Sequence, residues 1–195
     1  MRTGMLGGSF NPPHLGHLLL AESALQELAL DRVLFIPASQ SPFKPGLAAP
    51  DPATRCEMVA LAISDNPRFA LDTFEAERGG ISYTIDTVRH LRALSPADEL
   101  FLLLGADAFA EFPLWNSPEE IAREVMLAVA TRPGCAIDLA AHPFSARARS
   151  FAMPAVDIAS SDIRRRVAEG RSVRYLVPWT VHTFLDATAL YRNPA

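Results

Sequence analysis

Cysteine is scarce in this sequence, since its 195 residues include only Cys56 and Cys135. Two thiols so far apart provide neither a framework of disulfide bonds nor the closely spaced ligand pairs of a zinc site. The five histidines do not supply zinc-ligand spacing either. We therefore expect reduced thiols, a cytoplasmic location, and no metal ion held by a cluster of protein ligands.

Long apolar runs and an excess of basic residues are also lacking. No segment approaches the ~20 apolar residues that span a bilayer, and the N-terminus lacks a basic segment followed by an apolar one. The net charge at pH 7 is −4, whereas binding to nucleic acid or to a membrane surface usually needs a basic face. We therefore expect no transmembrane segment, no nucleic-acid partner and no membrane partner.

Hydrophobic residues, in contrast, make up 49% of the chain, which is ample for the core of a domain of this length. Apolar strand-like segments alternate with helical ones. The expected strands are 2–6, 32–36, 69–74, 100–104, 126–130 and 151–158, and the expected helices are 16–28, 52–64, 83–94, 118–124, 160–169 and 178–187, with 136–149 ambiguous. This alternation predicts an α/β fold, with a doubly wound, mainly parallel sheet that has helices on both faces. We expect one domain over residues 1–195, with a small helical part from about residue 160.

Several helix ends carry capping signals. Asp51 is expected to cap helix 52–64, and Ser117 begins a Ser-x-x-Glu capping box for helix 118–124. Ser160 and Ser161 are expected to cap helix 160–169, which Gly170 should end.

The first expected strand leads into the densest motif, residues 7–17, which reads Gly-Gly-Ser-Phe-Asn-Pro-Pro-His-Leu-Gly-His. Gly7 and Gly8 let the backbone turn and come close to a ligand. His14 and His17 flank a helix start, where free N–H groups, the helix dipole and two imidazoles favour a phosphate such as that of a nucleoside triphosphate. The pattern is neither the phosphate loop of nucleoside triphosphatases nor the dinucleotide fingerprint. The alternative is an ordinary strand-to-helix turn with two surface histidines.

A second anion site is suggested by Ser160-Ser161-Asp162-Ile163-Arg164. Two hydroxyls at a helix start and an arginine one turn later can bind a further phosphate, because the guanidinium is forked and permanently charged. A plain serine-capped helix is an equally good interpretation of the residues alone.

Three further stretches have binding and structural interpretations side by side. Asp107, after strand 100–104, can accept hydrogen bonds from ribose hydroxyls or cap a short helix, and Trp115 can stack on a heteroaromatic ring or pack in the core. Thr84, after Tyr83 at a helix start, can hold a small carboxylate or cap the helix. Lys44 is the only lysine among eighteen basic residues, which hints that an ammonium group is useful there, although chance explains one exception equally simply.

Together these motifs resemble the bacterial nicotinate-nucleotide adenylyltransferases, a family of the His-x-Gly-His nucleotidyltransferases, over nearly the whole chain. The His14–His17 and Ser160–Arg164 motifs are common to the wider superfamily. The Tyr-Thr pair at 83–84 and Trp115 are more specific, and Arg132-Pro133-Gly134 also falls in the family's order. Asn11 stands where the family usually has Asp, and Phe43 where a His normally precedes the lysine, so neither is assigned a role.

The resemblance implies transfer of the adenylyl group of ATP to nicotinate mononucleotide, with release of pyrophosphate and with Mg²⁺ bound mainly through the ATP phosphates. It implies a Rossmann-like nucleotidyltransferase fold and catalytic roles for His14, His17 and Arg164. The implied ATP-binding residues are Gly7, Gly8, Ser9, Phe10, His14, His17, Asp107, Ser160, Ser161 and Arg164, and those for nicotinate mononucleotide are Lys44, Tyr83, Thr84, Trp115 and Arg132.

Other functions stay open at this point. An adenylyltransferase for nicotinamide mononucleotide or phosphopantetheine, or a cytidylyltransferase, would share the first and last motifs. A non-catalytic nucleotide sensor is the alternative from a different class. A homo-oligomer is compatible with the sequence, which does not determine the oligomeric state.

Overall fold

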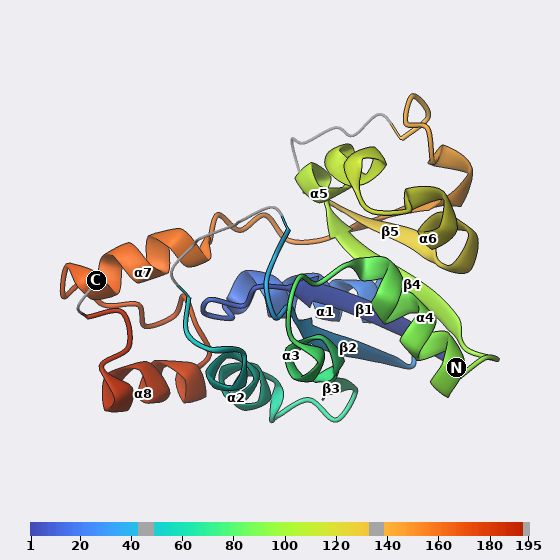
Figure 1. Cartoon of the computed structure of the whole chain (residues 1–195). Coiled ribbons are helices and arrows are strands. Elements are labelled where there is room, and N and C mark those ends of the chain that lie inside the picture. The colour runs from blue at the N-terminus through green and yellow to red at the C-terminus, as the bar shows by residue number, and fades with distance from the viewer. Residues whose placement is uncertain (43–48, 133–138, 193–195) are drawn as a thin grey trace.

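A computed structural model describes residues 1–42, 49–132 and 139–192. Its centre is a six-stranded sheet in the order β3-β2-β1-β4-β5-β6 (Figure 1). Every neighbouring pair of strands is parallel. The strands are β1 Arg2–Gly8, β2 Arg32–Pro37, β3 Phe69–Leu71, β4 Glu99–Gly105, β5 Met126–Thr131 and β6 Ala148–Ala152.

Helices cover both faces of this sheet. They are α1 Leu15–Glu27, α2 Pro52–Ile63, α3 Phe74–Arg78, α4 Thr84–Leu94, α5 Ala106–Glu111, α6 Pro118–Glu124, α7 Ser160–Ala168 and α8 Trp179–Thr188, with 3-10 turns η1 Phe112–Leu114 and η2 Ser145–Arg147. Among the described residues, no helix is long and apolar enough to cross a membrane.

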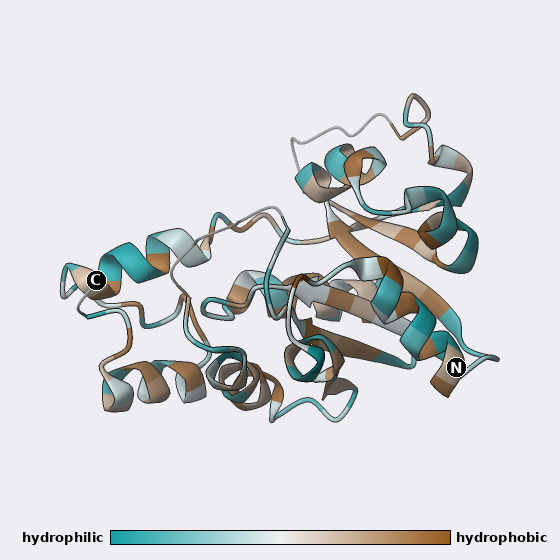
Figure 2. Ribbon diagram, viewed as in Figure 1, coloured by the Kyte–Doolittle hydropathy of each residue, from teal (hydrophilic) through white to brown (hydrophobic). Residues whose placement is uncertain are grey.

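The core has two layers because side chains alternate across each strand. In β2, Val33 and Phe35 join a cluster with α1 and α2, whereas Leu34 and Ile36 join a cluster with α4, α5 and α6. Strands buried on both faces are continuous apolar runs, which is typical of a parallel sheet between helices. Figure 2 shows these strands as mostly hydrophobic and much of α7 as hydrophilic. The doubly wound α/β fold expected from the sequence is therefore confirmed.

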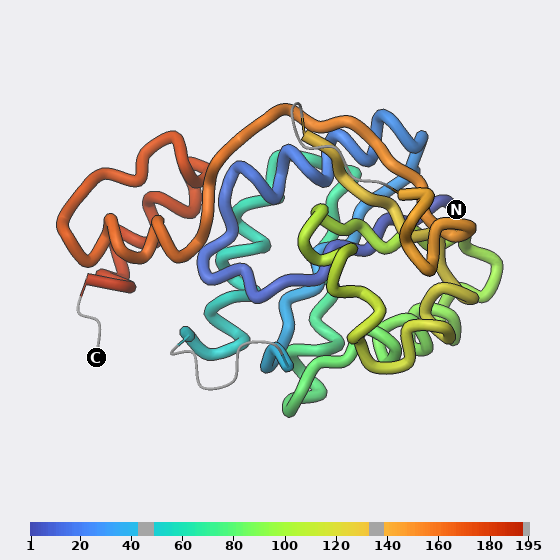
Figure 3. Tube along the Cα trace, turned by 90° about the horizontal axis from the view of Figure 1, so that it is seen from above, coloured from blue at the N-terminus to red at the C-terminus, as the bar shows by residue number. Residues whose placement is uncertain are grey.

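The C-terminal helices α7 and α8 lie to one side of the sheet, as the view from above shows (Figure 3). Ile163 of α7 and Leu185 of α8 nevertheless belong to the α1–α2 core cluster. Thr180 of α8 also donates from its hydroxyl to the carbonyl oxygen of Leu61 in α2, at 2.7 Å. These contacts attach α7 and α8 to the side of the core that contains α1 and α2.

Two expected strands differ from the observed ones by three residues or more at an end. β6 covers Ala148–Ala152 rather than 151–158, because its pairing with β5 ends at Thr131 opposite Ala152. The apolar residues beyond it, including Val156 and Ile158, pack on the α1–α2 cluster instead. β3 stops at Leu71, where the carboxylate of Asp72 accepts from the backbone N–H of Phe74 at the start of α3, a helix that the sequence did not predict.

The capping predictions had mixed outcomes. Asp51 caps α2, since its Oδ1 accepts from Thr54 N at 2.9 Å, and Gly170, with φ of +68°, ends α7. The capping box at Ser117 is wrong, because this residue has φ of +54° and its side chain makes no capping bond. Ser160 is not a cap either, because Ala159 holds the cap position and the Ser160 hydroxyl donates to Pro12 O at 2.9 Å.

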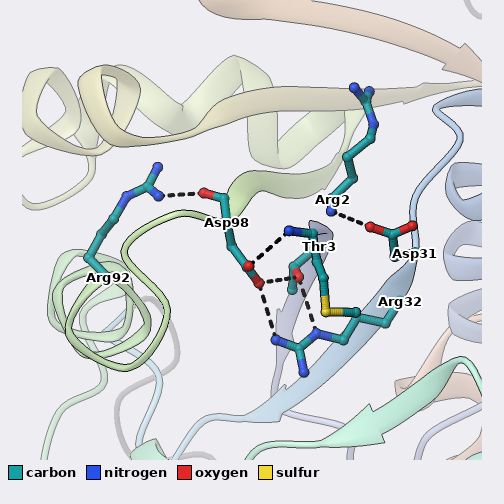
Figure 4. A network of polar contacts seen from close by, with 7 residues as sticks. Arg2, Thr3, Asp31, Arg32, Arg92 and Asp98 are labelled. Atoms are coloured by element: carbon teal, nitrogen blue, oxygen red, sulfur yellow. Dashed lines mark hydrogen bonds and ion pairs between the residues drawn. The ribbon is translucent and has the colours of Figure 1, made fainter.

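A polar network ties together the starts of β1, β2 and β4, at the end of the sheet opposite the glycine motif (Figure 4). Asp98 Oδ1 accepts from the Met1 ammonium at 3.0 Å. Its Oδ2 accepts from Thr3 Oγ1 at 2.9 Å and from Arg32 Nη2 at 3.3 Å. The hydrogen bond from the N-terminal ammonium is the main reason why the pKa of Asp98 lies below its ordinary value.

Candidate active site

A cavity of about 700 Å³ opens at the carboxyl ends of β1, β2 and β4. The chain adds β2 and β3 on one side of β1, and β4 to β6 on the other, so this is the point where the strand order reverses. Open α/β sheets bind ligands at such a point. Seven of the residues singled out from the sequence line the cavity: Gly7, Gly8, Ser9, His17, Tyr83, Thr84 and Trp115.

The glycines of the first motif leave room for neighbouring groups and do not adopt unusual backbone angles. A Cβ at Gly7 would meet nothing within 4 Å, so a larger side chain would extend into open space at the cavity. A Cβ at Gly16 would lie 3.0 Å from Nδ1 of His14. That contact is tighter than most Cβ contacts in proteins, so the missing side chain at Gly16 leaves room for the His14 ring against the first turn of α1.

His17 has a defined orientation. Its Nδ1 accepts a hydrogen bond from the backbone N–H of His14 at 3.1 Å, so in the neutral ring the hydrogen is on Nε2. The ring stacks on that of His14, with centroids 3.7 Å apart, and meets the edge of Phe10 at 5.0 Å. Because His17 also lines the cavity, these contacts fix its ring at the cavity wall.

His14 is not the surface residue of the alternative interpretation. It is 7% exposed, and burial lowers its pKa to about 4. At neutral pH His14 is therefore an uncharged imidazole, and it contributes hydrogen bonding rather than a full positive charge.

The side chain of Phe10 is buried in the core and does not line the cavity. It is 2% exposed, has φ of +44°, and packs against Phe35 with ring centroids 5.9 Å apart. A bulky residue rarely adopts a positive φ. The packing of its ring holds the backbone of this loop in that conformation.

The C-terminal part is bonded to the same loop. Arg164 Nη1 donates to Asn11 O at 2.8 Å, Ser160 Oγ donates to Pro12 O, and the Tyr191 hydroxyl donates to Asn11 Oδ1 at 2.6 Å. Arg164 and Ser160 thus lie beside the motif, although neither lines the cavity, and Ser161 is exposed. The sequence analysis missed Tyr191, because nothing near it in the chain indicates a partner at Asn11.

The Tyr83-Thr84 pair lies at the start of α4. Thr84 is the first helical residue, and Tyr83 is at the cap position without a capping bond from its side chain. The helix start is therefore not closed by the Tyr83 side chain and faces the cavity that Tyr83 and Thr84 line. Ser82, the residue before them, accepts from Ser39 N at 2.9 Å through its hydroxyl.

Of the remaining predicted residues that the structure describes, only Trp115 lines the cavity. Trp115 packs on Phe112 with ring centroids 5.4 Å apart and also lines the cavity, so the packing interpretation is confirmed and stacking on a ligand ring stays a prediction. Asp107 is exposed in the first turn of α5, where Gly105 is the cap residue, and it does not line the cavity. Arg132 is exposed directly after β5. Lys44 and the Pro-Gly turn at 133–134 lie outside the described residues.

Within the described ranges, no group of three or more His, Cys, Asp or Glu side chains is arranged to hold a metal ion.

Comparison with known proteins agrees with this geometry. The model of the cytidylyltransferase-like family matches residues 5–166. A probable nicotinate-nucleotide adenylyltransferase of Thermus thermophilus is 44% identical over 98% of this chain and 100% of its own length, and one of Thermomicrobium roseum is 43% identical over 98% and 92%.

Solved structures share the fold. The nicotinic acid mononucleotide adenylyltransferase of Plasmodium falciparum, complexed with NaAD, superposes with a TM-score of 0.80 at 17% identity, over 98% of this chain and 97% of that one. A putative nicotinate-nucleotide adenylyltransferase of Vibrio parahaemolyticus gives 0.72 at 23% identity, over 100% and 98%. At these identities the structures support the fold, whereas the closer sequence relatives support the family.

Proposed function

The chain belongs to the family of nicotinate-nucleotide adenylyltransferases, and from this premise we propose that it transfers the adenylyl group of ATP to nicotinate mononucleotide. An oxygen of the acceptor's 5′-phosphate forms a bond to the α-phosphorus of ATP. The bond from that phosphorus to the β-phosphate oxygen breaks, and pyrophosphate leaves. The products are nicotinate adenine dinucleotide and pyrophosphate, and the enzyme works in the cytoplasm.

One observation carries the proposal: a single cavity joins the phosphate motif to the acceptor motif. Gly7 and His17 line one part of it, and Thr84 and Trp115 line another. A volume of about 700 Å³ lies within the range of pockets that enclose small ligands. Donor and acceptor can therefore meet in one cavity without a covalent enzyme intermediate.

The reaction requires positioning and charge stabilisation more than an activated protein nucleophile. The acceptor phosphate is already an anion with nucleophilic oxygens, so no side chain needs to form a bond to phosphorus. His17 donates from Nε2 to the triphosphate, together with the N–H groups at the start of α1. Mg²⁺, held by phosphate oxygens and water, would supply further neutralisation of the charge on pyrophosphate.

Arg164 adds the permanent charge on the donor side. Its Nη1 is bonded to Asn11 O, but a guanidinium has five N–H donors. The remaining donors are enough for a bidentate contact with phosphate oxygens. The hydrogen bond to Asn11 then orients the guanidinium toward the loop that holds the triphosphate.

On the acceptor side, the backbone N–H groups at the start of α4 and the Thr84 hydroxyl are suited to the nicotinate carboxylate. Charge-assisted hydrogen bonds at a helix start favour an anion over a neutral amide. Trp115 offers a ring face for stacking on the pyridine. This combination favours nicotinate over nicotinamide as the acceptor base.

The test is to measure pyrophosphate release from ATP or CTP with nicotinate mononucleotide, nicotinamide mononucleotide or phosphopantetheine as acceptor. We expect the highest kcat/KM with ATP and nicotinate mononucleotide. His17→Ala, with its fold checked by circular dichroism, should lower turnover by ~10²–10³, the usual effect of losing one preorganised donor. A higher kcat/KM with another acceptor, or binding of ATP without turnover of any acceptor, would contradict the proposal.

A further inference from the structure

Arg55 of α2 is a buried cation without a carboxylate partner. It is 2% exposed, and within the described part of the chain it forms no ion pair. A buried charge without compensation strongly destabilises a fold. The contacts of the Arg55 guanidinium must therefore compensate its buried charge.

The guanidinium is enclosed by backbone carbonyl oxygens from three segments. Nη1 donates to Ser9 O at 2.9 Å and to Ala38 O at 2.5 Å. Nη2 donates to Ser39 O at 2.9 Å, and Nε donates to Pro50 O at 3.1 Å. Four of the five N–H donors are thus used on the backbone, so the side chain is arranged to hold loops together rather than to bind a ligand.

Ser82 holds the same segment from the other side. It is 7% exposed, its Oγ accepts from Ser39 N at 2.9 Å, and its own N–H donates to Gln40 O at 2.9 Å. Ser39 is therefore held at its carbonyl by Arg55 and at its N–H by Ser82. Segment 38–40 connects the loop after β1 to the start of α4, and both of these line the cavity.

We propose that Arg55 and Ser82 are positioning residues that fix the backbone of segment 38–40. This segment sets the spacing between the donor-phosphate loop at Ser9 and the acceptor pocket at Thr84. The proposal rests on the adenylyl transfer proposed above. In-line transfer depends on how closely the acceptor oxygen approaches the α-phosphorus, and a misplacement of about 1 Å can cost ~10²-fold in rate. Arg55 does not line the cavity; Ser82 does, but its hydroxyl oxygen accepts from Ser39 N.

The test uses Arg55→Lys, Ser82→Ala and the double variant, with Glu57→Gln on the exposed side of α2 as the control. Lysine keeps the positive charge but cannot bond four carbonyl oxygens in fixed directions. We expect Arg55→Lys to lower kcat by ~10–10². Ser82→Ala should raise KM for the acceptor several-fold with little change in KM for ATP, and the control should match wild type.

The double variant tests whether Arg55 and Ser82 act together through segment 38–40 or independently of each other. If both residues act through Ser39, the loss in kcat/KM for the double variant should be clearly smaller than the product of the single losses, because contacting residues are not additive. Multiplicative losses, or wild-type kinetics in Arg55→Lys, would overturn the proposal.

A purely structural role would lower Tm and the folded fraction while leaving kcat per folded molecule and both KM values unchanged, and that result would also overturn it. If Arg55→Lys does not fold, the KM split in Ser82→Ala decides alone. Failure of the proposed function is distinguishable, because then wild type itself would not turn over the nucleotide acceptors.

Discussion

His14 shows at the scale of one residue how burial changes the chemistry of the phosphate motif. Its ring lies between the first turn of α1 and the ring of His17, and its pKa is about 4. In the unfolded chain the pKa of a histidine is about 6.5. The folded state therefore resists protonation of this residue.

This difference predicts a pH dependence of stability. Between pH 6.5 and 4 the unfolded chain binds a proton that the folded state does not, so the free energy of unfolding falls as the pH falls through this window. The decrease from His14 alone should reach about 3 kcal/mol below pH 4. Urea unfolding at a series of pH values should show a smaller decrease for His14→Gln than for wild type; equal slopes would contradict the assignment.

Arg164 is predicted to depend on the shape of its guanidinium and not only on its charge. It bonds Asn11 O and, in the proposed reaction, binds phosphate oxygens with its other donors. We expect Arg164→Ala to lower kcat/KM by ~10² or more, and Arg164→Lys to recover little of it, because an ammonium acts as a point charge. Steady-state kinetics of both variants tests this. Recovery of wild-type kinetics with lysine would show that charge alone is sufficient.

Thr84 and Trp115 should affect acceptor choice differently. Thr84→Val removes a hydroxyl that favours the carboxylate, so it should lower the ratio of kcat/KM for nicotinate to that for nicotinamide mononucleotide, by ~10-fold for one charge-assisted bond. Trp115→Ala should weaken both acceptors to a similar extent, because stacking does not distinguish acid from amide. If the ratio is unchanged in Thr84→Val, this residue is not in the acceptor pocket.

At the scale of single elements, α1 departs from the usual rules of helix stability at Gly16. Replacing glycine by alanine inside a helix normally stabilises it by roughly 0.5–1 kcal/mol. Here a Cβ would lie 3.0 Å from Nδ1 and 3.1 Å from Cε1 of the buried His14 ring. The helix therefore gives up intrinsic stability so that the imidazole can occupy its place.

We accordingly expect Gly16→Ala to gain no stability and to lose most of its turnover, because His14 must move. Ser23→Ala, further along the same helix, is the matched control: it raises helix propensity without contacting His14 and should retain full activity. Thermal unfolding and turnover are measured on both. A gain in Tm with normal activity in Gly16→Ala would show that the His14 position is not important.

The starts of β1, β2 and β4 depend on Asp98. Because its folded pKa lies below the ordinary value near 3.9, the stabilisation is present above that pH and is lost as the pH falls through the lower folded value. Asp98→Asn should lower Tm at pH 7 by roughly 2–4 °C, the shift for about 1 kcal/mol in a chain of this size. The difference from wild type should shrink in acid; a difference independent of pH would argue against an ionic origin.

Element type was easier to predict from sequence than element bounds. The buried strands β2, β4 and β5 follow from continuous apolar runs, since both faces of the sheet are covered. The last strand was misplaced because Val156 and Ile158 are partly buried by packing on the α1–α2 cluster, and burial of this kind looks the same in the sequence as strand pairing. Ser117 and Ser160 were wrong as caps because a serine hydroxyl can bond elsewhere, and only tertiary structure shows where.

At the scale of the whole molecule, the site combines parts that are distant in the sequence. The phosphate motif was predictable from eleven consecutive residues, and the cavity brings it together with Thr84 and Trp115 as the resemblance implied. Arg55 and Tyr191 were not predictable, because each acts through a backbone or side-chain partner far along the chain. Arg55 reaches Ser9, 46 residues away, and Tyr191 reaches Asn11, 180 residues away.

The parallel sheet also determines how the molecule must fold. β1 pairs with β2 and with β4, so Arg2 lies opposite Glu99, and the strand that carries the glycines cannot be flanked on both sides until about half of the chain has collapsed. Pairings between residues so far apart in the sequence slow folding, because the entropy cost of closing the loop comes before the contacts that offset this cost. Refolding should therefore be slow for a chain of this length. The ability to bind nucleotide should return only in the late phase of refolding.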